Sequence, residues 1–204
     1  MSARDEVLAR VRSALGDAPS VPEVPRGYHG PGAAAADVDL FCERVADYQA
    51  TVHRVAAHEV GEVAARILAE HGAERVAGTI ELDGVAPDDP SLGPRELDAL
   101  DGVITGCALG IAETGTIVLD GGERSGRRAL TLVPDLHLCV VEEEQIVAGV
   151  PDAVARLGEA ARAGRPITLV SGPSATSDIE LDRVEGVHGP RRLEVLVVAP
   201  APQA

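Results

Sequence analysis

The sequence predicts an α/β fold, a single domain with a largely parallel sheet flanked by helices, preceded by an N-terminal helical arm. Short apolar, β-branched runs typical of strands alternate with segments of helical periodicity along most of the chain. The 204 residues suffice for one such domain with a proper core and are too few for two. We therefore expect helix and linker over residues 1–36, the α/β domain over 37–199 and a flexible tail over 200–204.

The N-terminal segment is typical of an amphipathic helix. Ser2 and Asp5 have capping-box spacing, and apolar side chains then recur at helical intervals before Gly16, at Val7, Leu8, Val11 and Leu15. Prolines and glycines between residues 19 and 32 break regular structure and predict an extended linker that could dock on the domain or on a partner. We expect limited proteolysis to cut within this linker.

Periodicity and turn signals divide the domain into alternating elements. Helices are predicted over residues 37–48, 60–71, 95–100 and 151–163, with a short helix or turn over 107–113. Strands are predicted over residues 51–55, 75–80, 103–106, 116–119, 136–141, 166–170 and 193–198. Loops rich in glycine, proline or aspartate are predicted over 82–94 and 121–128. Strands flanking the helix 60–71 form a βαβ unit, which predicts that they are parallel.

The polar stretch Ser171–Pro190 is the leading candidate for a functional site. It follows the strand 166–170, whose apolar residues suit a strand covered on both faces. Ligands of open α/β sheets bind at the carboxyl edge, where loops converge, so a small-molecule site is expected there. A structural alternative is that Ser177 and Glu180, which have capping-box spacing, begin a short helix that runs through Val184.

Hydroxyl groups and glycines in two parts of the chain could bind a ligand through O–H and backbone N–H donors. The candidate ligand-binding residues are Thr114, Gly115, Thr116, Ser171, Gly172, Ser174, Thr176, Asp178, Glu180 and Gly189. Asp178 and Glu180 would repel a phosphate and better suit sugar hydroxyls, an amine, an arginine or a hard cation. A compensating cation could come from the glycine-rich loop, although loop arginines are most often simply solvated; the candidates are Arg124, Arg127 and Arg128.

Glu113 and His188 are the candidate catalytic residues. Glu113 lies in a tight turn, where its carboxylate could act as nucleophile, general base or ligand clamp. Alternatively, Glu113 accepts backbone N–H bonds and Gly115 supplies an unusual φ angle. His188 lies in a glycine-rich turn, where it could be an acid/base group, a substrate contact or an ordinary surface residue.

These candidates are expected to meet at one cleft. If Glu113 and Ser171 follow parallel strands and His188 closes the loop, all three lie at the same sheet edge, together with Thr176 and Asp178. A carboxylate clustered with other acids would then have a raised pKa.

Composition excludes several classes of function. A formal charge of −15 disfavours binding to a nucleic-acid backbone or an anionic membrane, since both attract positive surfaces. The chain has no lysine, which excludes Schiff-base catalysis and a Walker lysine. Neither glycine-rich nucleotide-binding fingerprint is present, although this is weak evidence against nucleotides.

The three cysteines, Cys42, Cys107 and Cys139, lack C-x-x-C spacing. This pattern predicts no iron–sulfur cluster on the chain and suggests small core residues in a reducing compartment. His137 and Cys139 share one face of a predicted strand, but two ligands are too few for a metal site. No apolar run approaches membrane-spanning length, so we expect a cytoplasmic, colourless protein without a bound cofactor.

Four motifs in one order resemble the lactate utilisation protein C family, which is defined by the LUD domain. They are Val103–Gly106, Ile111–Thr116, Ser171–Glu180 and Gly186–Pro190. The resemblance implies a fold similar to the ribose-phosphate isomerase, glucosamine-phosphate deaminase and CoA-transferase group. It also implies a role in oxidation of L-lactate to pyruvate beside partner proteins that carry iron–sulfur clusters.

Three functions remain open on these grounds. The first is a non-redox subunit of a lactate-oxidising assembly, in keeping with the cysteine pattern. The second is a phosphosugar- or acyl-CoA-type enzyme, because CoA-transferases of the related fold use a Glu in a Glu-x-Gly turn and Glu113-Thr114-Gly115 is similar in form. The third is a small-molecule-binding regulatory module without turnover.

Overall fold

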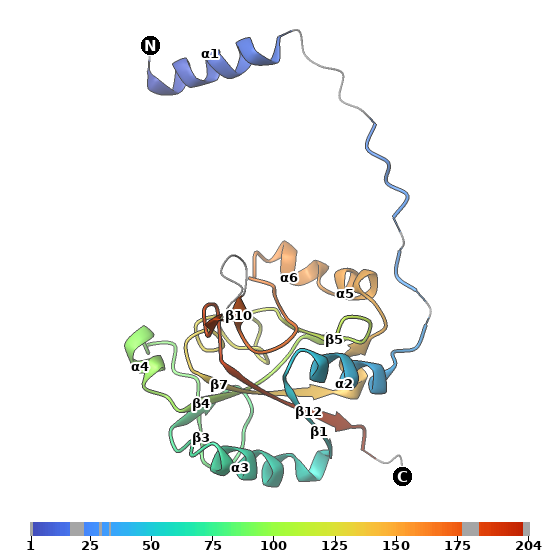
Figure 1. Cartoon of the computed structure of the whole chain (residues 1–204), viewed down its shortest axis with the longest axis vertical. Coiled ribbons are helices and arrows are strands. Elements are labelled where there is room, and N and C mark those ends of the chain that lie inside the picture. The colour runs from blue at the N-terminus through green and yellow to red at the C-terminus, as the bar shows by residue number, and fades with distance from the viewer. Residues whose placement is uncertain (1, 17–22, 29, 33, 177–183, 202–204) are drawn as a thin grey trace.

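The computed structural model describes residues 2–16, 23–28, 30–32, 34–176 and 184–201. Its centre is a six-stranded sheet of order β1-β12-β7-β4-β2-β3 in which all paired strands are parallel (Figure 1). The strands are β1 (Thr51–Ala56), β2 (Val76–Gly78), β3 (Val85–Pro87), β4 (Gly102–Gly106), β7 (Leu136–Glu142) and β12 (Arg192–Ala199). The α/β fold class and the parallel sheet are therefore confirmed. Strand β3 lies inside the segment that the sequence predicted to be a loop.

Helices cover both faces of this sheet. The α-helices are α1 (Ala3–Leu15), α2 (Val38–Asp47), α3 (Val60–Glu70), α4 (Pro94–Asp98), α5 (Val150–Arg156) and α6 (Gly158–Arg162), with short 3₁₀ turns at Ala57–Glu59 and Glu143–Gln145. Helix α3 packs Ala64 and Ile67 on one face, against Ile104, Leu138 and Leu196. None of the helices in the described part of the chain is long and apolar enough to cross a membrane.

A smaller mixed sheet packs with α2 on the other face of the parallel sheet. Its strands are β5 (Leu109–Ile111), β6 (Thr116–Leu119), β8 (Ile146–Val147) and β9 (Thr168–Val170), in the order β8-β5-β6-β9. Phe41 of α2 and Ile117 of β6 share one core cluster with Val195 of β12. The mixed sheet and β12 therefore cover the buried face of α2. The helix itself is capped at its N-terminus by the Asp37 side chain, which accepts a hydrogen bond from Leu40 N at 3.0 Å.

The helix or turn predicted over residues 107–113 is wrong, because this segment contains strand β5. Strand β5 pairs with β6 in an antiparallel hairpin and with β8, which lies 35 residues further along the chain, in parallel. Gly110 allows the Phe41 ring to pack closely beneath the strand, where a Cβ atom would lie 3.0 Å from the ring. A partner that distant in sequence leaves no signal in local periodicity.

The predicted strand 166–170 was expected to be covered on both faces, and this is also wrong. Its structured part, β9, is the edge strand of the mixed sheet and runs antiparallel to β6. Leu169 is 64% exposed. The carboxyl end of β9 is therefore not aligned with the carboxyl edge of the parallel sheet, and the topological argument that placed the Ser171 loop there fails.

Two further elements differ from expectation. Val184 was the end of the alternative helix, but it belongs to β11 (Val184–Glu185), which pairs antiparallel with β10 (Ala175–Thr176). The intervening candidates lie outside the described residues. The predicted helix 151–163 is divided into α5 and α6 by a turn at Leu157.

The predicted capping box of the N-terminal helix is confirmed. The Ser2 hydroxyl accepts a hydrogen bond from Asp5 N, and Ser2 N donates to the Asp5 carboxylate at 3.0 Å. Helix α1 buries none of its residues and stands apart from the α/β body (Figure 1).

Candidate functional site

A cavity of about 160 Å³ lies over the amino ends of β7 and β12, and we call it the Arg128 pocket. Strand β9 and the loops 171–174 and 188–190 close its other sides. Its lining residues are Arg128, Thr131, His137, Thr168, Leu169, Val170, Ser171, Gly172, Pro173, Ser174, His188, Gly189, Pro190 and Leu193. The pocket combines one guanidinium, two imidazoles and several hydroxyls in a volume suited to a small ligand.

The Arg128 guanidinium contacts only neutral oxygens among the described residues. Nη1 donates to Thr131 O at 3.0 Å and to Thr131 Oγ1 at 3.2 Å, and Nη2 donates to His188 O at 3.0 Å. Partial burial without a carboxylate lowers the pKa of Arg128. The cation is thus held in place by polar groups, while its charge is not neutralised by a described side chain.

His137 is buried beside this cation and is neutral at physiological pH. Burial, and secondly the charge of Arg128, lower the pKa of His137 to about 4. The Thr105 hydroxyl donates to Gly106 O at 2.9 Å and lies 2.8 Å from His137 Nε2. Because the single hydroxyl proton is given to Gly106 O, we assign the proton of the imidazole to Nε2, which leaves Nδ1 as an acceptor.

Hydroxyl groups form a chain at the edge of the pocket. Thr116 Oγ1 lies 2.7 Å from Thr114 Oγ1 and 2.8 Å from Ser171 Oγ. This arrangement follows from the strand register, since the residues after β9 continue alongside the start of β6. The Ser174 hydroxyl accepts a hydrogen bond from His188 N at 2.8 Å, so the two loops that close the pocket are joined directly.

Comparison with known proteins adds three findings. Residues 93–198 match the model of the LUD domain. Lactate utilization protein C of Deinococcus radiodurans is 46% identical over 207 aligned residues, which cover 96% of this chain and 95% of that protein. The chain belongs to the lactate utilization protein C family of LUD-domain proteins. This confirms the resemblance carried by the four sequence motifs.

Other relatives of this chain agree with its assignment to the family. Lactate utilization protein C of Geobacillus kaustophilus is 32% identical over 117 residues, covering 54% of this chain and 48% of that protein. The chain therefore aligns with about half the length of such relatives. A crystal structure of a DUF162 family protein from Deinococcus radiodurans superposes with a TM-score of 0.67 and 41% identity, covering 79% of this chain and 95% of that one.

Several of the ligand-binding residues predicted from the sequence lie together in this protein. Ser171, Gly172, Ser174 and Gly189 line the Arg128 pocket, as does the catalytic candidate His188. Thr114 and Thr116 reach it through the hydroxyl chain. Thr176 lies in β10, and the acidic candidates Asp178 and Glu180 lie outside the described residues.

Glu113 and Gly115, two further candidates from the sequence, do not line the Arg128 pocket. Glu113 is exposed and lies against Gly149 at the start of α5, and it does not line the pocket. Gly115 has φ of +58°, and a Cβ atom there would lie 2.5 Å from the backbone of Arg44. The φ angle that the alternative interpretation assigned to Gly115 is therefore present in the structure.

The three arginines of the glycine-rich loop are distinguished by their partners. Arg124 Nη2 pairs with Glu142 at 2.8 Å, and Arg127 Nε pairs with Asp88 at 3.1 Å. Only Arg128 of the three has no carboxylate partner among the described residues. From the sequence, all three arginines were possible partners of an anionic ligand, and no local signal distinguished Arg128 from the other two. His137 was considered from the sequence only as a metal ligand.

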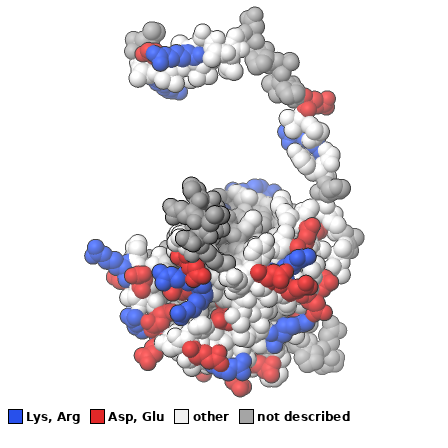
Figure 2. Space-filling model, in the orientation of Figure 1, with Lys and Arg blue, Asp and Glu red and all other residues white. Residues whose placement is uncertain are grey.

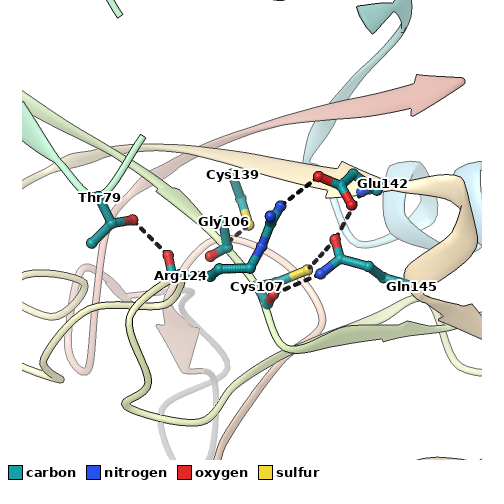
Figure 3. A network of polar contacts seen from close by, with 7 residues as sticks. All are labelled: Thr79, Gly106, Cys107, Arg124, Cys139, Glu142 and Gln145. Carbon is teal, nitrogen blue, oxygen red and sulfur yellow. Dashed lines mark hydrogen bonds and ion pairs between the residues drawn. The ribbon is translucent and has the colours of Figure 1, made fainter. Parts of the chain in front are cut away.

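The carboxyl edge of the parallel sheet carries a different network (Figure 3). Arg124 O accepts hydrogen bonds from Thr79 Oγ1 and from Gly106 N at 2.9 Å, and Gln145 Nε2 donates to Cys107 O at 2.9 Å. These bonds fix the glycine-rich loop across the ends of neighbouring strands.

A cleft of about 1300 Å³ beside this network is strongly acidic. Its carboxylates are Glu62, Glu81, Asp83, Asp88 and Glu123. Arg127, the arginine in its lining, pairs with Asp88. Acidic side chains also intersperse with arginines over the face seen in Figure 2, with no large basic patch there. This cleft would repel an anion, which makes the Arg128 pocket the better candidate for an anionic ligand.

We expect the cysteines to differ in reactivity. Cys107 and Cys139 are fully buried, whereas Cys42 is half-buried. Contact with Cys139, and then burial, raise the pKa of the Cys107 thiol well above its usual range. Iodoacetamide should therefore label Cys42 first in the native protein, and mass spectrometry should find Cys107 and Cys139 modified only after unfolding. Equal labelling of all three in the native state would show that this core opens readily.

Proposed function

We propose that this protein is a non-redox component of an iron–sulfur-dependent system that oxidises L-lactate to pyruvate, and that its Arg128 pocket binds a small carboxylate such as lactate or pyruvate. Membership of the lactate utilization protein C family supports the role in lactate oxidation. The three cysteines lack cluster-binding spacing, which supports a non-redox role with clusters on partner proteins. The Arg128 pocket supports the proposed ligand class, a small carboxylate.

The observation that carries the ligand proposal is the Arg128 guanidinium, which lines the pocket without a carboxylate partner among the described residues. A partly desolvated cation is stabilised by an anion, and arginine binds carboxylates through two parallel N–H donors. The Ser171 hydroxyl can then donate to the keto oxygen of pyruvate or to the hydroxyl of lactate, whereas His137 Nδ1, as an acceptor, can bind only the lactate hydroxyl. The volume of about 160 Å³ suits such an acid and is small for a nucleotide or CoA.

Isothermal titration calorimetry with L-lactate and with pyruvate tests the ligand proposal. Arg128→Gln should weaken binding by roughly 10- to 100-fold, because it removes charge-assisted hydrogen bonds of about 1.5–3 kcal/mol. Arg66→Gln is the matched control, since it removes one positive charge from an exposed site on α3, on the other face of the sheet, and should leave binding unchanged. Lactamide, the neutral analogue, should not bind.

Two results would count against the proposal. Equal affinity of wild type and Arg128→Gln would exclude this pocket, provided that circular dichroism shows both folded. No affinity for any small carboxylate would exclude the ligand class. Co-purification of the full chain with iron–sulfur partners tests the role in the assembly separately.

A phosphosugar- or acyl-CoA-type enzyme using Glu113 is not favoured by the position of that residue. Glu113 is exposed beside Gly149 and does not line the Arg128 pocket. Its catalytic role stays a prediction from the sequence.

A further inference from the structure

Helix α1 presents an apolar stripe that no described residue covers. Val7, Leu8, Val11 and Leu15 are 59%, 37%, 49% and 57% exposed, although their spacing places them along one side of the helix. A 13-residue helix is marginal in water by itself, so most of its stability has to come from packing of the apolar side. The stripe therefore indicates a docking partner.

An apolar groove of about 580 Å³ lies between α5, α6 and β9, and we call it the α5 groove. Its walls include Tyr48, Val150, Val154, Ile167 and Leu169, which are all more than a third exposed. The α1 stripe and these five residues make up nine of the fourteen large apolar side chains exposed in the described part of the chain. Contiguous apolar surface of this kind marks an interaction site.

One contact connects the α5 groove with α1. The arm that carries α1 is held against α5, the helix that forms one wall of the groove, since Gly32 N donates to Asp152 Oδ1 of α5 at 2.9 Å.

The arm favours the groove of another molecule over its own. It leaves the body next to α5, and α1 stands apart from that body (Figure 1). Pro25 and Pro31, in the described part of the arm, favour an extended chain there, which opposes the reversal needed to return α1 to the adjacent groove. We propose that α1 of one copy docks in the α5 groove of a second copy, and that reciprocal exchange closes a two-fold dimer.

Light scattering coupled to gel filtration of the full chain tests this proposal. The wild type should be a dimer. Val11→Asp on the stripe and Val154→Asp in the groove should each raise the dimer dissociation constant by at least about 10-fold, because each places a charge in an apolar contact. Both residues are exposed, so circular dichroism and thermal unfolding of the body should be unchanged. Val24→Asp, in the arm and 53% exposed, is the matched control and should remain dimeric.

Mixing the two variants identifies the occupant of the groove. A mixture of Val11→Asp and Val154→Asp should recover a fraction of dimer, since one intact helix meets one intact groove in each heterodimer. A monomeric wild type, a dimer that persists in Val11→Asp, or a mixture that stays fully monomeric would each overturn the proposal.

Discussion

Replacing Gly115 with alanine should lower the free energy of unfolding by roughly 2–5 kcal/mol, the sum of a left-handed backbone penalty and overpacking. Gly115 has φ of +58°, and an added Cβ atom would lie 2.5 Å from both the Arg44 carbonyl carbon and its Cβ. The hairpin between β5 and β6 therefore touches the backbone of α2, and neither element can yield without displacing buried Phe41 or Val45. Urea denaturation monitored by circular dichroism measures the change.

Gly164→Ala is the matched control for this prediction. Gly164 also has a left-handed φ, of +69°, but an added Cβ atom would have no heavy atom within 4 Å. This control should cost only about 1–2 kcal/mol of backbone strain. If both variants lose the same stability, the contact between the hairpin and α2 is looser than the structure indicates.

Lowering the pH from 7 to 4 should remove about 3 kcal/mol of stability through His137 alone. The pKa of His137 is lowered by burial from 6.5 to about 4 in the folded protein. Below pH 6.5 the unfolded chain therefore binds a proton that the folded protein does not, and stability falls until the pH reaches about 4. Denaturant titrations between pH 4 and 7, without added carboxylates, measure this dependence.

The contribution of His137 can be separated from that of the carboxylates. His137→Gln should flatten the difference between pH 7 and pH 4 by about 3 kcal/mol relative to wild type. His58→Gln, which removes an exposed imidazole, controls for the loss of a histidine. An unchanged slope in His137→Gln would show that this imidazole is hydrated in the folded state. Binding of an anion beside Arg128 should raise the pKa of His137 and shift the same window upward.

The candidate site was predicted in part. The hydroxyl-rich loop was recognised from its composition, and Ser171, Ser174 and His188 line one pocket. The place of this pocket in the fold was not predicted. The rule that ligands bind at the carboxyl edge of the sheet assumes that the strand before the loop belongs to the parallel sheet. Strand β9 instead pairs antiparallel with β6 in the mixed sheet, which brings Ser171 to Thr116.

Features encoded over a few residues were determined by the sequence itself. These features depend on spacings along the sequence. They are the capping box of Ser2 and Asp5, the apolar faces of α2 and α3, the alternation of strands and helices that gives an α/β fold, and the motifs of the family. Only the tertiary structure decided which of three neighbouring arginines has no carboxylate partner among the described residues, that His137 is buried beside it, and that β5 pairs with a strand 35 residues away. The physical reason is that charge pairing, desolvation and strand partnership depend on groups distant in sequence, whose approach is set by packing of the whole core.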